Sequence, residues 1–170
     1  MLNALARWNR LSAEEAENEI VACCGSRVWA RRMANRRPIA DEALLLRASD
    51  EVWCSLSEQD WKEAFESHPR VGESQPPEAA TRRAAMWSAN EQRQISSESD
   101  SVKAALAAGN QEYERRFGRI FIVCATGKTG AEILAILRDR LHNDRATEVR
   151  EAAEQQRQIT RLRLKRWLSQ

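Results

Sequence analysis

The chain has 170 residues, of which 42% are apolar and 31% are charged, a composition that excludes a disordered chain. Its 27 Lys and Arg exceed its 25 Asp and Glu by only two charges, which is too few to indicate a nucleic-acid or membrane partner. No apolar run approaches the roughly 20 residues that a membrane-spanning helix needs. Six glycines and four prolines are too few for the turns of a β-sandwich or barrel. The sequence therefore predicts an all-α fold.

The four cysteines include no Cys-x-x-Cys pair, so we expect neither a zinc site nor any other metal site. The N-terminal residues lack the apolar stretch of a secretory signal, and the final residues, WLSQ, are no peroxisomal address. The sequence thus predicts a cytoplasmic protein with reduced, buried thiols.

The first half of the chain carries clear signals for the beginnings and ends of helices. Ser12 stands three residues before Glu15, the spacing of a capping box that opens a helix, and Gly25 ends that helix. A second helix ends before Pro38, and Asp41 is placed to cap the next. A short helix around residues 60–65 follows.

Residues 67–77 hold three of the four prolines and one glycine, which predicts a loop inside one domain. His68 precedes Pro69, so its imidazole projects from a stiff, extended backbone. Imidazole suits proton transfer near neutral pH. The alternative is a loop histidine that bonds a nearby carbonyl. The other histidine, His142, is expected to bond carbonyls at a helix end.

The second half of the sequence predicts helices over 78–95, 99–116, 129–141 and 145–168. A capping box marks the start of the helix over 129–141. Residues 120–125, IFIVCA, favour a strand locally, but no second run of this kind exists to pair with them. We therefore expect one short extended segment near 119–126, buried among helices. Its backbone groups need partners, which a bound amide- or urea-like ligand could supply. In all, the sequence predicts a single domain over 1–170, a bundle of about seven to nine helices.

Two helices carry polar side chains that could bind a ligand. Ser88, Glu91 and Gln92 are spaced to share one helical face, although a solvated face gives the same pattern. In the last helix, an apolar stripe that includes Ile159 and Leu162 continues to Arg163. An arginine aimed at the interior needs an anionic partner, such as a ligand carboxylate. The alternative is an arginine that extends back to the surface.

Six motifs stand out along the chain: IVACCGSRVW at 20–29, RRPI at 36–39, HPRVGE at 68–73, WSANEQ at 87–92, FGRIFIVCATGKTGAEIL at 117–134 and RLHNDRATEVREAAEQQRQITRLRL at 140–164. In these motifs the chain resembles the 2-oxo-4-hydroxy-4-carboxy-5-ureidoimidazoline (OHCU) decarboxylase family over nearly its whole length. The resemblance implies an all-helical homodimer that needs no cofactor and converts OHCU to (S)-allantoin in urate breakdown.

The resemblance also implies the site. It makes His68 and Glu91 the catalytic residues, with His68 in proton transfer. The residues that it implies for substrate binding are Pro69, Ser88, Gln92, Phe121, Ile122 and Arg163. Two other classes stay open: a non-enzymatic helical module that binds nucleic acid or protein, and a cofactor-free lyase for a related ureide.

Overall fold

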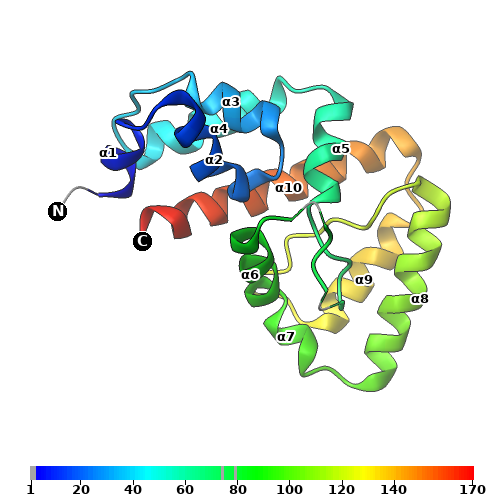
Figure 1. Ribbon diagram of the computed structural model, residues 1–170. Helices are drawn as coiled ribbons and strands as arrows, with labels where there is room; N and C mark the ends of the chain where they lie inside the picture. Colours follow the sequence, from blue (N-terminus) through cyan, green and yellow to red (C-terminus); the bar gives the residue numbers. More distant parts are fainter. Residues whose placement is uncertain (1–2, 74, 79) are drawn as a thin grey trace. The chain divides into compact units, whose positions relative to one another are not determined.

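The structure, a computed structural model, describes residues 3–73, 75–78 and 80–170, which contain ten helices and no strand (Figure 1). The helices are α1 (Ala4–Trp8), α2 (Ala13–Cys24), α3 (Arg27–Ala34), α4 (Glu42–Cys54), α5 (Glu58–Glu66), α6 (Arg82–Glu91), α7 (Arg93–Ser96), α8 (Asp100–Phe117), α9 (Gly130–Arg140) and α10 (Arg145–Leu168). The predicted all-α class is confirmed. The number exceeds the expected seven to nine because α1 and α7 are single turns of five and four residues.

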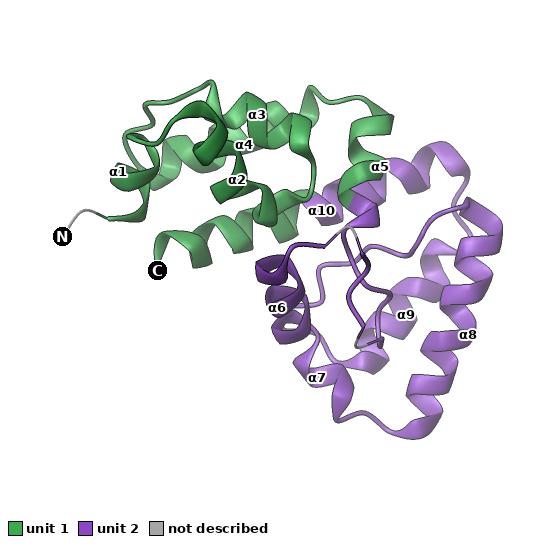
Figure 2. Cartoon of the chain, in the orientation of Figure 1, with its two compact units in different colours: residues 1–64, 157–170 green, residues 65–156 purple. Residues whose placement is uncertain are grey.

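The described chain forms two compact units (Figure 2). The first contains the residues up to Ala64 together with Arg157–Gln170, and the second contains Phe65–Gln156. Helix α10 supplies residues to both. The expectation of a single domain over the whole chain stays a prediction.

Three predicted helix starts, at Ser12, Asp41 and Thr129, are confirmed. Ser12 with Glu15, and Thr129 with Glu132, form complete capping boxes at the starts of α2 and α9. Asp41 accepts a hydrogen bond from the backbone N–H of Leu44 at 2.8 Å. These caps satisfy N–H groups that the first turn of a helix leaves without partners.

One predicted helix, 78–95, is wrong in its bounds. In the structure α6 begins at Arg82, and Gln92 interrupts the helix before α7, with backbone angles of φ −98° and ψ 13°. Residue 79 of that predicted helix, and residue 74 of the predicted 67–77 loop, lie outside the described residues.

Two tryptophans anchor the core of the first unit. The rings of Trp8 and Trp167 meet edge to face with their centroids 6.0 Å apart. Both indole N–H groups are satisfied, since Trp8 donates to the carbonyl of Ala16 and Trp167 to Oε1 of Glu19, each at 2.9 Å. Buried aromatic rings of this kind contribute both apolar area and a fixed geometry.

The second unit packs α8 and α9 around the extended segment 119–126, whose residues 121–125 are all buried. Side chains replace the missing strand partner. The Ile122 carbonyl accepts from Nη1 of Arg140 at 2.5 Å, and the Cys124 N–H donates to Oε1 of Gln155 at 2.9 Å. Nζ of Lys128 donates to the Cys124 carbonyl at 2.8 Å. The prediction of a buried extended segment is confirmed, and the protein itself provides these three hydrogen bonds.

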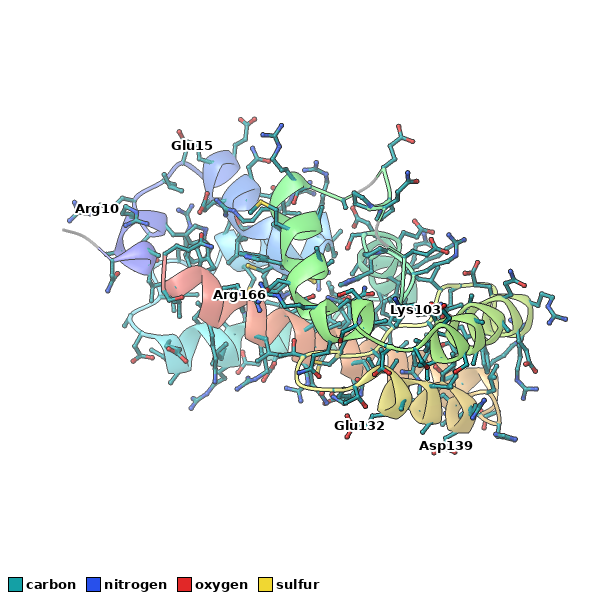
Figure 3. All side chains as sticks on the ribbon, turned by 90° about the horizontal axis from the view of Figure 1, so that it is seen from below. Arg10, Glu15, Lys103, Glu132, Asp139 and Arg166 are labelled. Carbon is teal, nitrogen blue, oxygen red and sulfur yellow. The ribbon has the colours of Figure 1, made fainter. Side chains whose placement is uncertain are left out.

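The exposed faces of the helices carry charged side chains. Glu132 and Asp139 lie on the outer side of α9 (Figure 3), whereas Ile133 and Leu137 on its inner side are fully buried. Among the described residues, no helix combines the length and the hydrophobicity needed to cross a bilayer.

Gly109 lets α8 and α9 approach each other closely. A Cβ atom at this position would lie 2.6 Å from Cδ2 of Leu137, so this fully buried side chain would have to shift. We therefore expect Gly109→Val to lower the free energy of unfolding by about 1–3 kcal/mol through overpacking. Urea denaturation measures this loss. Adding Leu137→Ala should give a double variant that loses less stability than the two single variants together, and additive losses would contradict the close approach.

Candidate active site

The loop that follows α5 positions the first candidate residue. It turns at residues 70–73, where the Glu73 N–H donates to the Arg70 carbonyl at 3.0 Å, and Gly72 adopts the left-handed conformation with φ +89°. A side chain is strained at such a φ, which explains the glycine. His68 stands just before this turn and is buried.

The imidazole of His68 is held by a side chain of α10. Its Nε2 lies 2.7 Å from Oε1 of Gln156, which is completely buried. The partner is a side-chain amide 88 positions away, so the local carbonyl considered as an alternative does not describe this contact. By contrast, Nδ1 of His142 lies 2.9 Å from the Arg138 carbonyl, and the helix-end role expected for this second histidine is confirmed.

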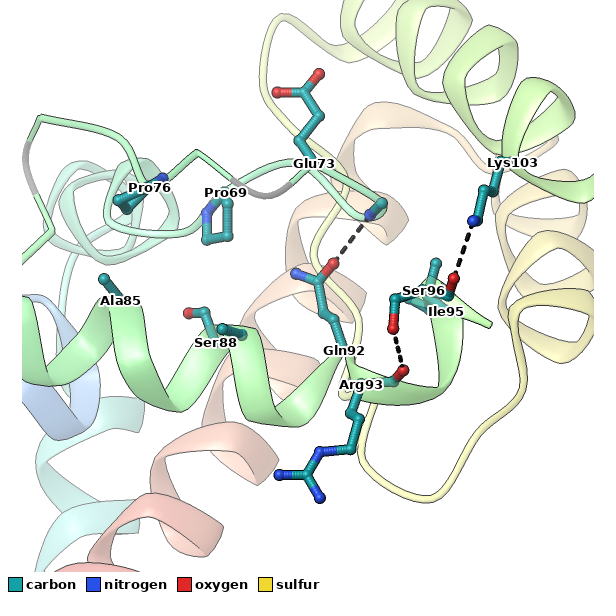
Figure 4. Close-up of a pocket in the computed structure, with 12 residues that line it drawn as sticks. Pro69, Glu73, Pro76, Ala85, Ser88, Gln92, Arg93, Ile95, Ser96 and Lys103 are labelled. Carbon is teal, nitrogen blue, oxygen red and sulfur yellow. Dashed lines mark hydrogen bonds between the residues drawn. The ribbon is translucent and has the colours of Figure 1, made fainter. Parts of the chain in front are cut away.

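A cavity of about 380 Å³ lies between the loop and helices α6, α7 and α8 of the second unit. Pro69, Ser88 and Gln92 are among its lining residues, so the structure brings three of the predicted substrate-binding residues together. In Figure 4, Ser88 and Gln92 lie on the side of α6 that faces Pro69, whereas the guanidinium of Arg93 points away. The volume suits a small polar ligand.

Gln92 also links the loop to the helices through a hydrogen bond. Its Oε1 accepts a hydrogen bond from the backbone N–H of Gly72 at 2.9 Å (Figure 4). Gln92 is the residue at which the helix is interrupted between α6 and α7. The amide group of Gln92 can still donate, because a primary amide carries two N–H groups in addition to its oxygen.

Four predicted residues of the second unit, His68, Glu91, Phe121 and Ile122, are not among the residues that line this cavity. Glu91 is half-buried at the last position of α6. Phe121 and Ile122 are each 2% exposed within the extended segment, where Phe121 packs edge-on against the ring of Tyr113 at 5.3 Å. Their roles in binding or catalysis stay predictions.

Arg163 belongs to the first unit and is 1% exposed, so it points inward as expected and does not extend to the surface. Its Nη1 donates to the carbonyl of Ala22 at 3.3 Å. The predicted apolar stripe of α10 is wrong at Leu162, because this side chain is 37% exposed while Leu164 is fully buried. The helical repeat of 3.6 residues carries the buried face through 163 and 164 instead. The role of Arg163 in ligand binding stays a prediction.

A buried ion pair was missed by the sequence analysis. Glu148 is fully buried, and its Oε1 accepts from Nε of Arg140 at 2.9 Å and from Nη2 at 2.5 Å. The hydroxyl of Tyr113 donates to the same oxygen at 2.5 Å, and Nδ2 of Asn143 donates to Oε2 at 2.9 Å. Burial, followed by this bond to Glu148, raises the pKa of Tyr113 above its ordinary range, so the phenol stays protonated.

Three of the four cysteines are buried, which makes them poor candidates for nucleophiles. Burial raises the pKa of Cys24 to about 12, which keeps the thiol protonated at neutral pH. Cys23 and Cys124 are buried as expected, whereas Cys54 is exposed, which corrects the expectation that all four are core residues. Over residues 3–73, 75–78 and 80–170, no three His, Cys, Asp or Glu side chains come together as metal ligands.

The sequence pattern of the OHCU decarboxylase family matches residues 9–165 of the chain. The chain belongs to the OHCU decarboxylase family. The resemblance drawn from the motifs is thereby confirmed, and the long motifs at 20–29, 117–134 and 140–164 lie within the matched region.

Two curated relatives of this family member act in urate breakdown according to their names. The uric acid degradation bifunctional protein TTL of Arabidopsis thaliana is 33% identical over 159 residues, which cover 94% of this chain and 49% of that protein. A uric acid degradation bifunctional protein of Bacillus sp. (strain TB-90) is 24% identical over 163 residues, which cover 94% of this chain and 31% of that protein. The chain thus spans about half or less of the length of these relatives.

Solved structures share the fold. The crystal structure of an OHCU decarboxylase in the presence of (S)-allantoin superposes with a TM-score of 0.77 at 32% identity, over 90% of this chain and 99% of that one. The crystal structure of an (S)-allantoin synthase superposes with a TM-score of 0.73 at 17% identity, over 96% of this chain and 54% of that one. The second likeness concerns the fold alone.

Proposed function

We propose that this chain is a decarboxylase that converts OHCU to (S)-allantoin as a step of urate breakdown. The observation that carries the proposal is the cavity in which Pro69, Ser88 and Gln92 meet, in a chain of the OHCU decarboxylase family. The likeness to an OHCU decarboxylase solved in the presence of (S)-allantoin supports the same substrate class.

The reaction needs little from the protein beyond orientation of the substrate and the transfer of one proton. The bond between the ring carbon and the carboxylate breaks, CO₂ leaves, and the electron pair passes into the conjugated C=N system of the ring. The hydroxyl on that carbon then loses its proton and becomes the ring carbonyl, while a proton adds from one face to the neighbouring carbon that bears the ureido group, which sets the configuration of the product. We assign this transfer to His68, with Glu91 orienting either His68 or the substrate hydroxyl.

The binding roles follow from the polar groups available. The hydroxyl of Ser88 and the amide of Gln92 can hold the ring and ureido groups, because together they offer both donors and acceptors. Arg163 is proposed to hold an anionic or carbonyl oxygen through its planar guanidinium. A carboxylate held out of the plane of the ring loses CO₂ most readily, so orientation is the main contribution of these side chains.

The assay that tests the proposal follows the chirality of the product. Urate is oxidised and the first product hydrolysed in the same cuvette, so that OHCU forms in place, and circular dichroism records optically active allantoin. Added protein should make this signal appear faster. An unchanged rate of appearance would contradict the assignment, and turnover of a different ureide alone would favour the related lyase.

We also propose that the reaction needs no metal or other cofactor, because the substrate ring itself accepts the electron pair. Decarboxylation should therefore proceed at the same rate after dialysis against EDTA. A loss of activity that added zinc or magnesium restores would overturn this part of the proposal.

The expected homodimer and cytoplasmic location belong to the same proposal and rest on the family resemblance. Light scattering of the purified chain measures the first, and a mass of one chain would contradict it. The non-enzymatic alternative, a nucleic-acid-binding module, would show salt-dependent binding that His68→Asn leaves unchanged.

Gln92→Leu tests the role of the amide that lines the cavity. We expect kcat/KM to fall about 10–100-fold, because the substitution removes both a substrate partner and the acceptor of the Gly72 N–H. Hydrogen exchange at the Gly72 amide should become faster at the same time. The control is Gln94→Leu on the exposed side of α7, which should change neither quantity. Normal kcat/KM in Gln92→Leu would remove Gln92 from the site.

A further inference from the structure

We propose that Gln156 is the positioning residue of His68: it sets the orientation of the imidazole and determines which ring nitrogen carries the proton. The inference rests on the proposed function, in which His68 transfers a proton, and it adds a residue that the motif comparison did not assign. The observation that supports the inference is the 2.7 Å contact between Nε2 of His68 and Oε1 of Gln156, with both side chains buried.

The surroundings of Gln156 make it a rigid partner. It lies in the 24-residue helix α10, and this stretch of the helix is fixed by other hydrogen bonds of the second unit. Eight positions earlier, Glu148 binds Arg140, and one position earlier, Gln155 accepts from the backbone N–H of Cys124. A buried amide on such a support holds its partner in one orientation.

The chemistry of an amide explains the choice of residue. The oxygen of a glutamine side chain can only accept a hydrogen bond, so the imidazole must carry its proton on Nε2. In the neutral ring the lone pair then lies on Nδ1, the nitrogen able to take up a proton. A carboxylate at position 156 would orient the ring equally well but would also favour its charged form. Glutamine therefore orients the ring without adding charge.

The position also has a sequence signal in retrospect. Gln156 stands four residues after Ala152 and seven before Arg163, so it lies on the buried stripe of α10, where Ala152 is fully buried. A polar residue on a buried stripe needs a hydrogen-bond partner. His68 is one such partner in the structure.

The first test reads the tautomer directly and needs no substrate. In protein labelled with ¹⁵N at histidine, the chemical shifts of the neutral His68 ring should show the proton on Nε2, with the exposed His142 as an internal reference. Gln156→Met, which has a similar length but no amide oxygen, should give a mixture of tautomers. A wild-type ring protonated on Nδ1, or a tautomer unaffected by Gln156→Met, would overturn the proposal.

The second test separates positioning from stability. We expect Gln156→Met to lower kcat by about 10- to 100-fold while KM stays close to the wild-type value, since only the alignment of the proton donor or acceptor changes. Gln156→Glu retains an acceptor oxygen and should give a higher kcat than Gln156→Met, and at a pH where its His68 ring is neutral the proton should lie on Nε2. Gln94→Met, an exposed position on α7, is the matched control and should behave as wild type.

The outcomes distinguish this proposal from the proposed function. If wild type forms no optically active allantoin but the tautomer changes as described, the decarboxylase assignment fails and the positioning role stands. If wild type is active and both Gln156 variants match it in kcat, the positioning role fails alone. Should Gln156→Met not fold, the wild-type spectrum and the Gln156→Glu variant still decide the question.

Discussion

His68→Asn is expected to reduce kcat for decarboxylation by about 10²–10⁴-fold, because it removes the group to which we assign proton transfer. Asparagine is smaller than histidine and can still form a hydrogen bond in the buried position beside Gln156, so the fold should be retained. The rate of appearance of optically active allantoin measures the loss. Far-ultraviolet circular dichroism and the Tm of the variant establish that it is folded.

The second histidine offers a matched control. His142 lies exposed after the end of α9, where its ring meets the Arg138 carbonyl, and His142→Asn should leave kcat unchanged. A His68→Asn variant that is folded and as active as His142→Asn would remove His68 from the mechanism.

Glu148→Leu should cause the largest loss of stability among these substitutions. Leucine occupies a similar volume but leaves the buried guanidinium of Arg140 without its anionic partner, and the hydroxyl of Tyr113 loses its acceptor. Removing one member of a buried ion pair costs about 3–5 kcal/mol. For a chain of this length, the Tm should fall by roughly 6–20 °C. Urea denaturation gives the change in the free energy of unfolding.

An exposed ion pair gives the comparison. The side chains of Arg36 and Glu51 are 43% and 52% exposed, so Glu51→Leu should cost less than about 1 kcal/mol. The double variant Arg140→Met/Glu148→Leu should be more stable than Glu148→Leu alone, because it leaves no unpaired charge. Equal effects of Glu148→Leu and Glu51→Leu would show that burial does not strengthen this pair.

The parts of the fold that the sequence predicted depend on neighbours along the chain. A capping box such as Ser12 with Glu15 needs only three residues of spacing, so its position could be predicted without knowledge of the fold. The interruption at Gln92 could not, because it coincides with a hydrogen bond to Gly72, twenty positions earlier. Contacts of this kind form only once the chain has folded.

The candidate site, too, could be predicted from the sequence only in part. Ser88 and Gln92 share a face by helical spacing, and the structure places both in one cavity with Pro69. Glu91 was expected on that face too, but α6 ends at this residue, and it does not line the cavity. Gln156 was missed because its partner lies 88 positions away, although its place on a buried stripe was a usable signal.

The way in which the segment 119–126 is held has a consequence for changing this protein. In a β-sheet, the path of a strand is determined by main-chain hydrogen bonds, which a substitution other than proline leaves in place. Here the Ile122 carbonyl and the Cys124 N–H are bound by the side chains of Arg140 and Gln155. A substitution of Gln155 can therefore release one defined point of the backbone, whereas a substitution of Arg140 would also leave the buried Glu148 without its cationic partner, so the course of this segment is open to engineering at Gln155.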